Sequence, residues 1–350
     1  MTVRLYRSTD ASAPTLNGQA GSLTAVLDAC LVNGYGSQTA AGWSIAYTAT
    51  NRRAYKQGAG GNHPSGIHLY VDDTAPGGGL GREARVCGFE TMSAITPVGT
   101  GQFPNNTQSA IGVGCLVIRK SNTNDATARK WYVIADQHTF YLFVEIGDNN
   151  APNLTGGGFM FGDFKSYKSG DAYAVMIIGR TRENTTDPRC DNISLIPGSA
   201  SYGVNNNLSG HFIARHWNQS AVSVRAGKLF DSSRTNTTSS WLGDNSDFQN
   251  EGGCAPGFCN DSQRAPFPNP VDGAMWMAPF YVNQNGIRGY LRGLWGPMHQ
   301  WPLNPGDTFT VGSGELSGKS FVATAGVIAI YSGPQSRPTQ FFVEFSDTWP

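Results

Sequence analysis

Residues 131–150 read WYVIADQHTFYLFVEIGDNN, and this stretch sets the fold class expected for the whole chain. Two short runs, Trp131–Ala135 and Thr139–Ile146, are rich in β-branched and aromatic residues. The clusters ADQH and GDNN follow them and are typical of turns. Runs of this length between turn residues indicate β-strands rather than helices.

The same pattern recurs along the chain and predicts an all-β protein. Further strands are predicted at 67–71, 113–118, 172–179, 212–217, 221–224, 308–311, 321–331 and 340–345. The 44 glycines and the low charged fraction of 14% favour strands joined by turns over helices. We therefore expect a β-sandwich or barrel-like architecture.

One short α-helix is predicted near the N-terminus, over about residues 22–33. Leu23, Val26, Leu27, Cys30 and Leu31 follow the spacing of one helix face. Ser22 suits the N-cap, and Gly34 suits the stop.

Two β-rich units are predicted, with the boundary at the glycine- and asparagine-rich segment 147–158. The first covers 1–148 and includes the helix. The second covers 159–350 and contains a long irregular loop at 232–270. One integrated domain is the alternative.

No catalytic, metal or cofactor motif is predicted. The segment GSGELSGKS (312–320) ends like a phosphate-binding loop but has Ser313 where the motif needs glycine, so we interpret it as a hairpin turn. The chain has no GxSxG or HExxH sequence. Cys254 and Cys259 are too few ligands for zinc, and the acidic segment 244–251 lacks the glycine of a calcium loop.

Paired carboxylates are the remaining candidates for catalysis, because glycosidases use two of them. The candidate pairs are Asp72 with Asp73, Glu145 with Asp148, and Asp163 with Asp171. Each lies at a predicted strand end or turn, where aspartate commonly accepts hydrogen bonds from nearby backbone. We therefore expect a structural role for them and no enzymatic activity.

Charge and cysteine content limit the partners. Lys plus Arg equals Asp plus Glu, 25 each, which argues against direct nucleic-acid binding. No apolar run is long enough for a membrane span, and no signal peptide is predicted. The six cysteines are accordingly expected to be thiols rather than a disulfide framework, with Cys254 and Cys259 the pair most open to oxidation.

The segment RGYLRGLWGPMHQWPLNPGDTF (288–309) is the candidate for packing or partner contact. Tyr, Trp and Arg are enriched at interface hot spots, and the prolines favour an irregular path without strand pairing. We expect Tyr290, Leu294 and Trp295 to be largely buried. The candidate contact residues are Arg288, Tyr290, Leu294, Trp295, His299 and Trp301.

Four segments together resemble a family of virion structural proteins of tailed bacteriophages and prophages. They are residues 1–36, TFYLFVEIGD (139–148), FGDFKSYKSGDAY (161–173) and GYLRGLWGPMHQWPLNPGDTF (289–309). The resemblance spans most of the chain and is least clear at 232–270. It brings no catalytic residues with it.

The resemblance implies a non-enzymatic component of the particle, made in the bacterial cytoplasm and built in or near the tail. Its partners would be other virion proteins and copies of itself. The position stays open among tube, baseplate, neck and fibre attachment. Three alternatives also stay open: a capsid decoration protein, a module that binds host glycans, and a polysaccharide-degrading enzyme.

Overall fold

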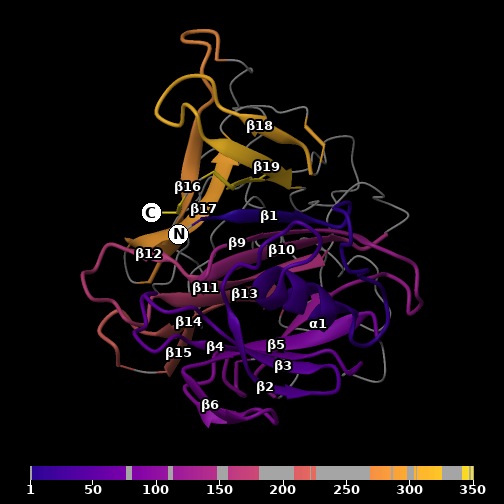
Figure 1. Cartoon of the computed structure of the whole chain (residues 1–350). Coiled ribbons are helices and arrows are strands. Elements are labelled where there is room, and N and C mark those ends of the chain that lie inside the picture. The colour runs from indigo at the N-terminus through magenta and orange to yellow at the C-terminus, as the bar shows by residue number, and fades with distance from the viewer. Residues whose placement is uncertain are drawn as a thin grey trace, which may run out of the picture.

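The computed structural model describes residues 2–75, 81–108, 113–147, 157–180, 209–220, 222–225, 269–284, 287–297, 303–304, 306–324, 341–346 and 348–349. Within these residues the protein is mostly β, as predicted (Figure 1). The strands are β1 Arg4–Arg7, β2 Ser44–Ala49, β3 Arg52–Lys56, β4 His68–Asp72, β5 Glu83–Phe89, β6 Thr91–Ala94, β7 Val98–Thr100, β8 Leu116–Arg119, β9 Lys130–Ala135, β10 Thr139–Glu145, β11 Gly157–Asp163, β12 Lys165–Ser166, β13 Val175–Arg180, β14 Ser209–Arg215, β15 Val222–Arg225, β16 Met277–Asn283, β17 Ile287–Pro297, β18 Thr308–Thr310, β19 Ser320–Thr324 and β20 Phe341–Glu344.

Two large sheets hold most of these strands. The first has 12 strands, ordered β1-β9-β10-β11-β13-β8-β5-β4-β3-β2, with β14 and β15 branching from β13. The second has six, ordered β12-β17-β20-β19-β18, with β16 beside β17. A small hairpin, β6-β7, completes the set. Neither strand order closes on itself over the described residues, so the barrel expected as one form of the fold is not found.

Strand β10 is buried on both faces, which places it at the centre of the molecule. Phe140, Leu142 and Val144 point into the core of the first sheet. Tyr141 and Phe143 point into a second core, shared with the second sheet. Because side chains alternate across a strand, one apolar strand supplies both layers.

The first core also holds the helix. It begins as α1 (Ser22–Leu27) and continues as a π-helical segment, η1 (Asp28–Asn33), so the predicted span 22–33 is confirmed. All five predicted apolar positions are buried in this core. The prediction of Ser22 as N-cap is wrong: Gly21 is the N-cap, and the Ser22 hydroxyl donates back to the Asn17 and Gln19 carbonyls. Gly34 ends the helical segment, as predicted.

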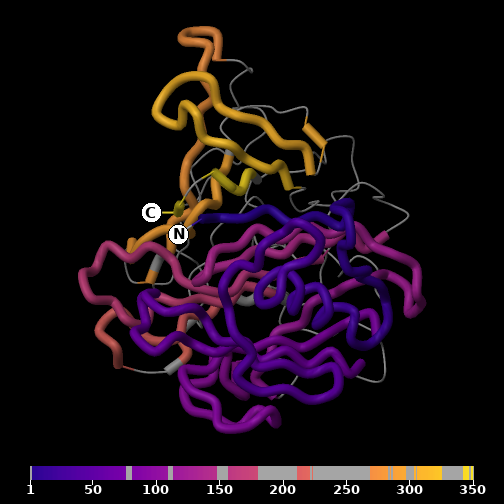
Figure 2. Tube along the Cα trace, viewed as in Figure 1, coloured from indigo at the N-terminus to yellow at the C-terminus, as the bar shows by residue number. Residues whose placement is uncertain are grey.

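The second sheet packs on the outer face of β9, β10, β11 and β13, above them in the view of Figures 1 and 2. Leu291 and Leu294 of β17 meet Tyr141 and Met160 in this inter-sheet core. Both chain ends also reach it, through Val3 and Trp349.

The first sheet continues through the proposed domain boundary. β10 and β11 flank segment 147–158 and pair over six positions, from Thr139 with Gly162 to Val144 with Gly157. Strands of both predicted units therefore share one sheet. The second sheet starts only at β12.

The segment that resembles a phosphate-binding loop is a hairpin, as interpreted from the sequence. β18 and β19 pair antiparallel from Thr308 with Val322 to Thr310 with Ser320, and residues 311–319 connect them. Most of segment 232–270, together with Cys190, Cys254, Cys259, Asp148 and the acidic segment 244–251, lies outside the described residues.

Candidate functional site

Strand β17 carries most of the residues singled out in the sequence. The expected irregular path is wrong for 287–297, because β17 pairs with β12, β16 and β20. Glycines at 289 and 293 permit the close approach of neighbouring groups: a Cβ at Gly289 would lie 1.9 Å from the Lys165 carbonyl oxygen. Pro297 stands at the end of the strand, where a missing N–H costs little.

The expected burial of three side chains is confirmed for one of them. Leu294 is buried between the sheets. Tyr290 and Trp295 are only half-buried, so the prediction is wrong for them. Trp295 packs edge-on against Phe321, with the ring centroids 6.5 Å apart. His299 and Trp301 lie outside the described residues.

Arg288 is the centre of a buried polar cluster. Its Nε donates to Asp171 Oδ2 at 2.8 Å and its Nη2 donates to Asp171 Oδ1 at 2.7 Å. Its Nη1 donates to the Arg215 carbonyl and to Gln284 Oε1, both at 2.7 Å. This bidentate arrangement satisfies the buried guanidinium and joins β17 to the loop after β12, to β14 and to the end of β16.

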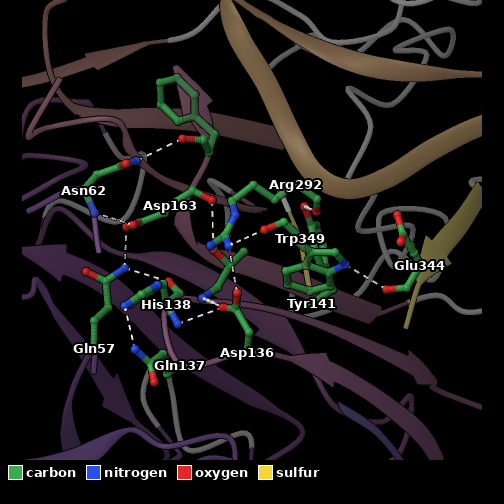
Figure 3. Close-up of polar contacts among 12 residues, drawn as sticks. Gln57, Asn62, Asp136, Gln137, His138, Tyr141, Asp163, Arg292, Glu344 and Trp349 are labelled. Carbon is green, nitrogen blue, oxygen red and sulfur yellow. Dashed lines mark hydrogen bonds and ion pairs between the residues drawn. The ribbon is translucent and has the colours of Figure 1, made fainter. Parts of the chain in front are cut away.

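Arg292, on the same face of β17, makes a second tie between the sheets. Its Nη2 lies 2.9 Å from Asp136 Oδ2 and donates to the Trp349 carbonyl at 3.1 Å (Figure 3). The Arg292 carbonyl accepts from the Tyr141 hydroxyl at 2.7 Å. Sequence analysis did not select Arg292. The signal for Arg292 in the sequence is its spacing: it lies four residues after Arg288, and residues four apart share one face of a strand.

Asp163 lies near the Arg292–Asp136 ion pair, and hydrogen-bond donors contact both of its carboxylate oxygens. Oδ1 accepts from Gln57 Nε2 at 2.8 Å, and Oδ2 accepts from the Asn62 backbone N–H at 2.6 Å (Figure 3). The loop 58–66 lies directly over it: a Cβ at Gly61 would sit 2.9 Å from Asp163 Oδ2 and 3.0 Å from His138 Cδ2. Burial raises the pKa of Asp163 above its ordinary value, because few solvent dipoles stabilise the charge.

The candidate carboxylate pairs lie in separate networks. Asp171 is bound to Arg288, whereas Asp163 is bound to Gln57 and Asn62. Asp72 accepts from Thr74 in a turn, as expected, but its neighbour Asp73 forms an ion pair with Lys120. The expectation of nearby backbone contacts is therefore wrong for Asp73, Asp163 and Asp171. The first two bind groups distant in sequence, whereas Asp171 binds Arg288 and the nearby Ser166 hydroxyl. All three are buried and hydrogen-bonded, which places none of them at an open surface.

Exposed aromatic side chains surround the Arg288 cluster. Tyr167 is 59% exposed and Trp217 is 48% exposed. The Tyr167 and Tyr290 ring centroids are 5.9 Å apart, and Tyr290 lies opposite Tyr281 on the neighbouring strand. Lys168 Nζ lies 5.5 Å from the centroid of the Trp217 ring. We call this surface the aromatic patch, defined by Lys165, Tyr167, Lys168, Trp217, Tyr281 and Tyr290.

A second exposed apolar surface lies at the turn before β16. Val271 is 89% exposed and Trp276 is 44% exposed. Asp272 braces the turn by accepting from the Ala274 N–H and from Trp276 Nε1. We call residues 269–276 the tip, because they form the orange turn that projects at the top of Figure 1.

The described residues contain no group of three or more His, Cys, Asp or Glu side chains arranged to hold a metal. Their helix is also too short to cross a membrane. No protein-family model matches the sequence, and a search of curated proteins gives no match. The fold and the site together define an all-β protein of two sheets joined through β17.

Proposed function

We propose that this protein is a non-enzymatic structural component of a tailed bacteriophage particle, built in or near the tail. The resemblance of four sequence segments to virion structural proteins supports the class. The architecture agrees with a rigid structural subunit. The Arg288–Asp171 and Arg292–Asp136 ion pairs and a shared core hold the two sheets together.

The observation that carries this proposal is the tip. A largely exposed valine and an exposed tryptophan lie together on this projecting turn and offer apolar surface to a partner. Tryptophan is also among the residues that dominate protein–protein interfaces. We infer that the tip inserts into a neighbouring virion protein or into another copy of this chain.

The net charge agrees with such a role. Equal numbers of acidic and basic residues give a free protein little electrostatic protection from self-association. A subunit that is covered by neighbours has less need of it. The capsid decoration protein remains the alternative within the same class.

The test has two stages. Purified particles of the source phage or prophage are first analysed by quantitative mass spectrometry, and the protein is expected at a fixed copy number per particle. An antibody against the chain should then label the tail in electron micrographs. Absence from purified particles would overturn the proposal, whereas labelling of the head alone would favour capsid decoration.

The tip variant Val271→Ser/Trp276→Ala tests the contact. We expect it to keep the melting temperature of the wild type and to be incorporated into particles at least about tenfold less, since hot-spot truncations each cost about 2 kcal/mol or more. The matched control is Tyr167→Ala, which removes an exposed aromatic side chain from the aromatic patch. This variant should be incorporated normally.

A further inference from the structure

The aromatic patch carries two exposed lysines. Lys165 and Lys168 are both exposed, and neither has an acidic partner among the described residues. The one carboxylate of the adjoining cluster, Asp171, is buried and bound at both oxygens by Arg288. The patch therefore presents uncompensated positive charge beside exposed rings on a protein whose net charge is zero.

The backbone of Tyr167 and of Trp217 is hydrogen-bonded to the Arg288 cluster or its neighbours. The Tyr167 N–H donates to the Arg288 carbonyl at 2.8 Å, and the Trp217 N–H donates to Gln284 Oε1 at 3.1 Å. The Lys168 ammonium also donates to the Trp217 carbonyl. Both aromatic residues are thus anchored on the buried Arg288 cluster. Anchoring lowers the entropy that a surface loses when it binds a ligand.

One buried amide beside the Arg288 cluster has a donor that is unpaired among the residues that the structure describes. Gln284 is 2% exposed, and its Oε1 is shared between Arg288 and the Trp217 backbone. Its Nε2 has no hydrogen-bond partner among the described residues. A buried amide without a partner is costly, so it marks a place where an outside acceptor would be stabilising.

We propose that the aromatic patch is a binding site for a polysaccharide that bears carboxylate groups, such as a polymer of uronic acids. The apolar faces of pyranose rings pack on Tyr167, Tyr290 and Trp217. Lys165 and Lys168 pair with the sugar carboxylates, and the phenol hydroxyls donate to ring and hydroxyl oxygens. Burial raises the pKa of Tyr290, so its hydroxyl keeps its proton at neutral pH.

Single-stranded nucleic acid also combines rings with negative charge, but the patch suits it less. Nucleic-acid sites use a basic groove that follows several phosphates. The patch has only two lysines, and the whole chain has no basic excess. This site also does not depend on the role of the tip in assembly, because Tyr281 lies five residues beyond the tip, about 17 Å away along an extended strand.

The test is affinity electrophoresis and calorimetry of the purified full chain with alginate, hyaluronan and polygalacturonate. Neutral dextran and oligo(dT) serve as comparison ligands. We expect at least one of the three acidic polysaccharides to bind and dextran not to bind. Tyr167→Ala and Trp217→Ala should each weaken binding about tenfold or more. Lys168→Glu should abolish binding, and added salt should weaken it.

Two matched controls keep the result specific. Trp276→Ala removes an exposed tryptophan at the tip, and Lys130→Glu reverses an exposed lysine on the first sheet. Both should bind as the wild type does. The proposal is overturned if none of the three acidic polysaccharides binds, if dextran binds equally well, or if oligo(dT) binds more tightly. It is also overturned if Tyr167→Ala abolishes self-association rather than binding of polysaccharide.

Discussion

Arg288 shows how much one buried residue constrains its surroundings. Four of its five N–H groups donate to Asp171, Gln284 and a backbone carbonyl, and its guanidinium lies 5.3 Å from the centre of the Phe164 ring. An arginine is suited to this place because its planar fork can bind both carboxylate oxygens at once. A buried charge that loses such a partner is strongly destabilising.

We therefore expect Asp171→Ala to lower the free energy of unfolding by about 3–5 kcal/mol. Urea denaturation followed by tryptophan fluorescence measures this. Lys130→Met breaks the ion pair between an exposed lysine and Glu145, which keeps its hydrogen bond from the Tyr132 hydroxyl, and should cost no more than about 1 kcal/mol. A cost for Asp171→Ala as small as that of Lys130→Met would show that the Arg288 cluster is not needed for stability.

Asp163 should make stability depend on pH. Its pKa in the folded protein lies above the ordinary value of 3.8, so the folded state holds the proton more tightly than the unfolded state does. The stability from this group is complete below pH 3.8 and is lost as the pH rises through the folded pKa.

The expected result is that Asp163→Asn removes this part of the pH dependence. Unfolding free energies of the wild type and the variant are measured from pH 4 to pH 8. The stability of the variant relative to the wild type should increase as the pH rises. Asp125→Asn, an exposed aspartate, is the control for general effects of charge removal. Parallel curves for the wild type and Asp163→Asn contradict the prediction.

At the scale of elements, the helix shows how a short segment is held by distant groups. The α1 helix has no side-chain cap of its own. Instead, Asp73 Oδ2 accepts from the Leu23 N–H at 2.8 Å, and Asp73 Oδ1 pairs with Lys120. The Lys120 ammonium also donates to the Gln19 carbonyl and to the Ser22 hydroxyl. Burial raises the pKa of Asp73 and lowers that of Lys120, and the pairing opposes both effects.

Asp73→Ala should therefore cost about 3–5 kcal/mol, because it leaves Lys120 buried without its counter-ion. The double variant Asp73→Leu/Lys120→Met should recover a large part of that loss. Hydrogen exchange at the Leu23 amide should accelerate in both variants, since both lack the acceptor. Arg52→Ala, which breaks a partly exposed pair with Asp72, should cost no more than about 1 kcal/mol. A double variant as unstable as the single one refutes this account.

For the whole molecule, the central question is whether the two sheets unfold together. Their shared core contains Tyr141 and Met160 from the first sheet and Leu291 and Leu294 from the second. Arg292 adds a polar tie to Asp136 across the same junction. A shared core and buried ties favour a single cooperative transition.

Leu294→Ala tests this cooperativity. We expect a loss of about 2–5 kcal/mol, as for other buried leucines. Hydrogen exchange by mass spectrometry should show the amides of β10 and β19 accelerating by the same factor. Faster exchange in β19 alone would mean that the second sheet unfolds independently, and it would support two units rather than one.

The sequence by itself determined the local structure. The apolar runs predicted β9 and β10, the helical spacing predicted 22–33, and the glycine-rich segment 312–320 predicted a hairpin turn. These signals succeed because they depend on residues a few positions apart, through side-chain alternation, helical periodicity and turn geometry.

Only the tertiary structure decided the rest. Segment 287–297 carries glycines and a proline that suggest an irregular path, yet β17 is a strand because β12, β16 and β20 supply its hydrogen-bond partners. Asp171 meets Arg288 across 117 positions, and Tyr167 meets Tyr290 through the same junction. No local pattern encodes such pairs. They form because the path of the chain brings two sheets together, and the burial of charge then makes each partner necessary.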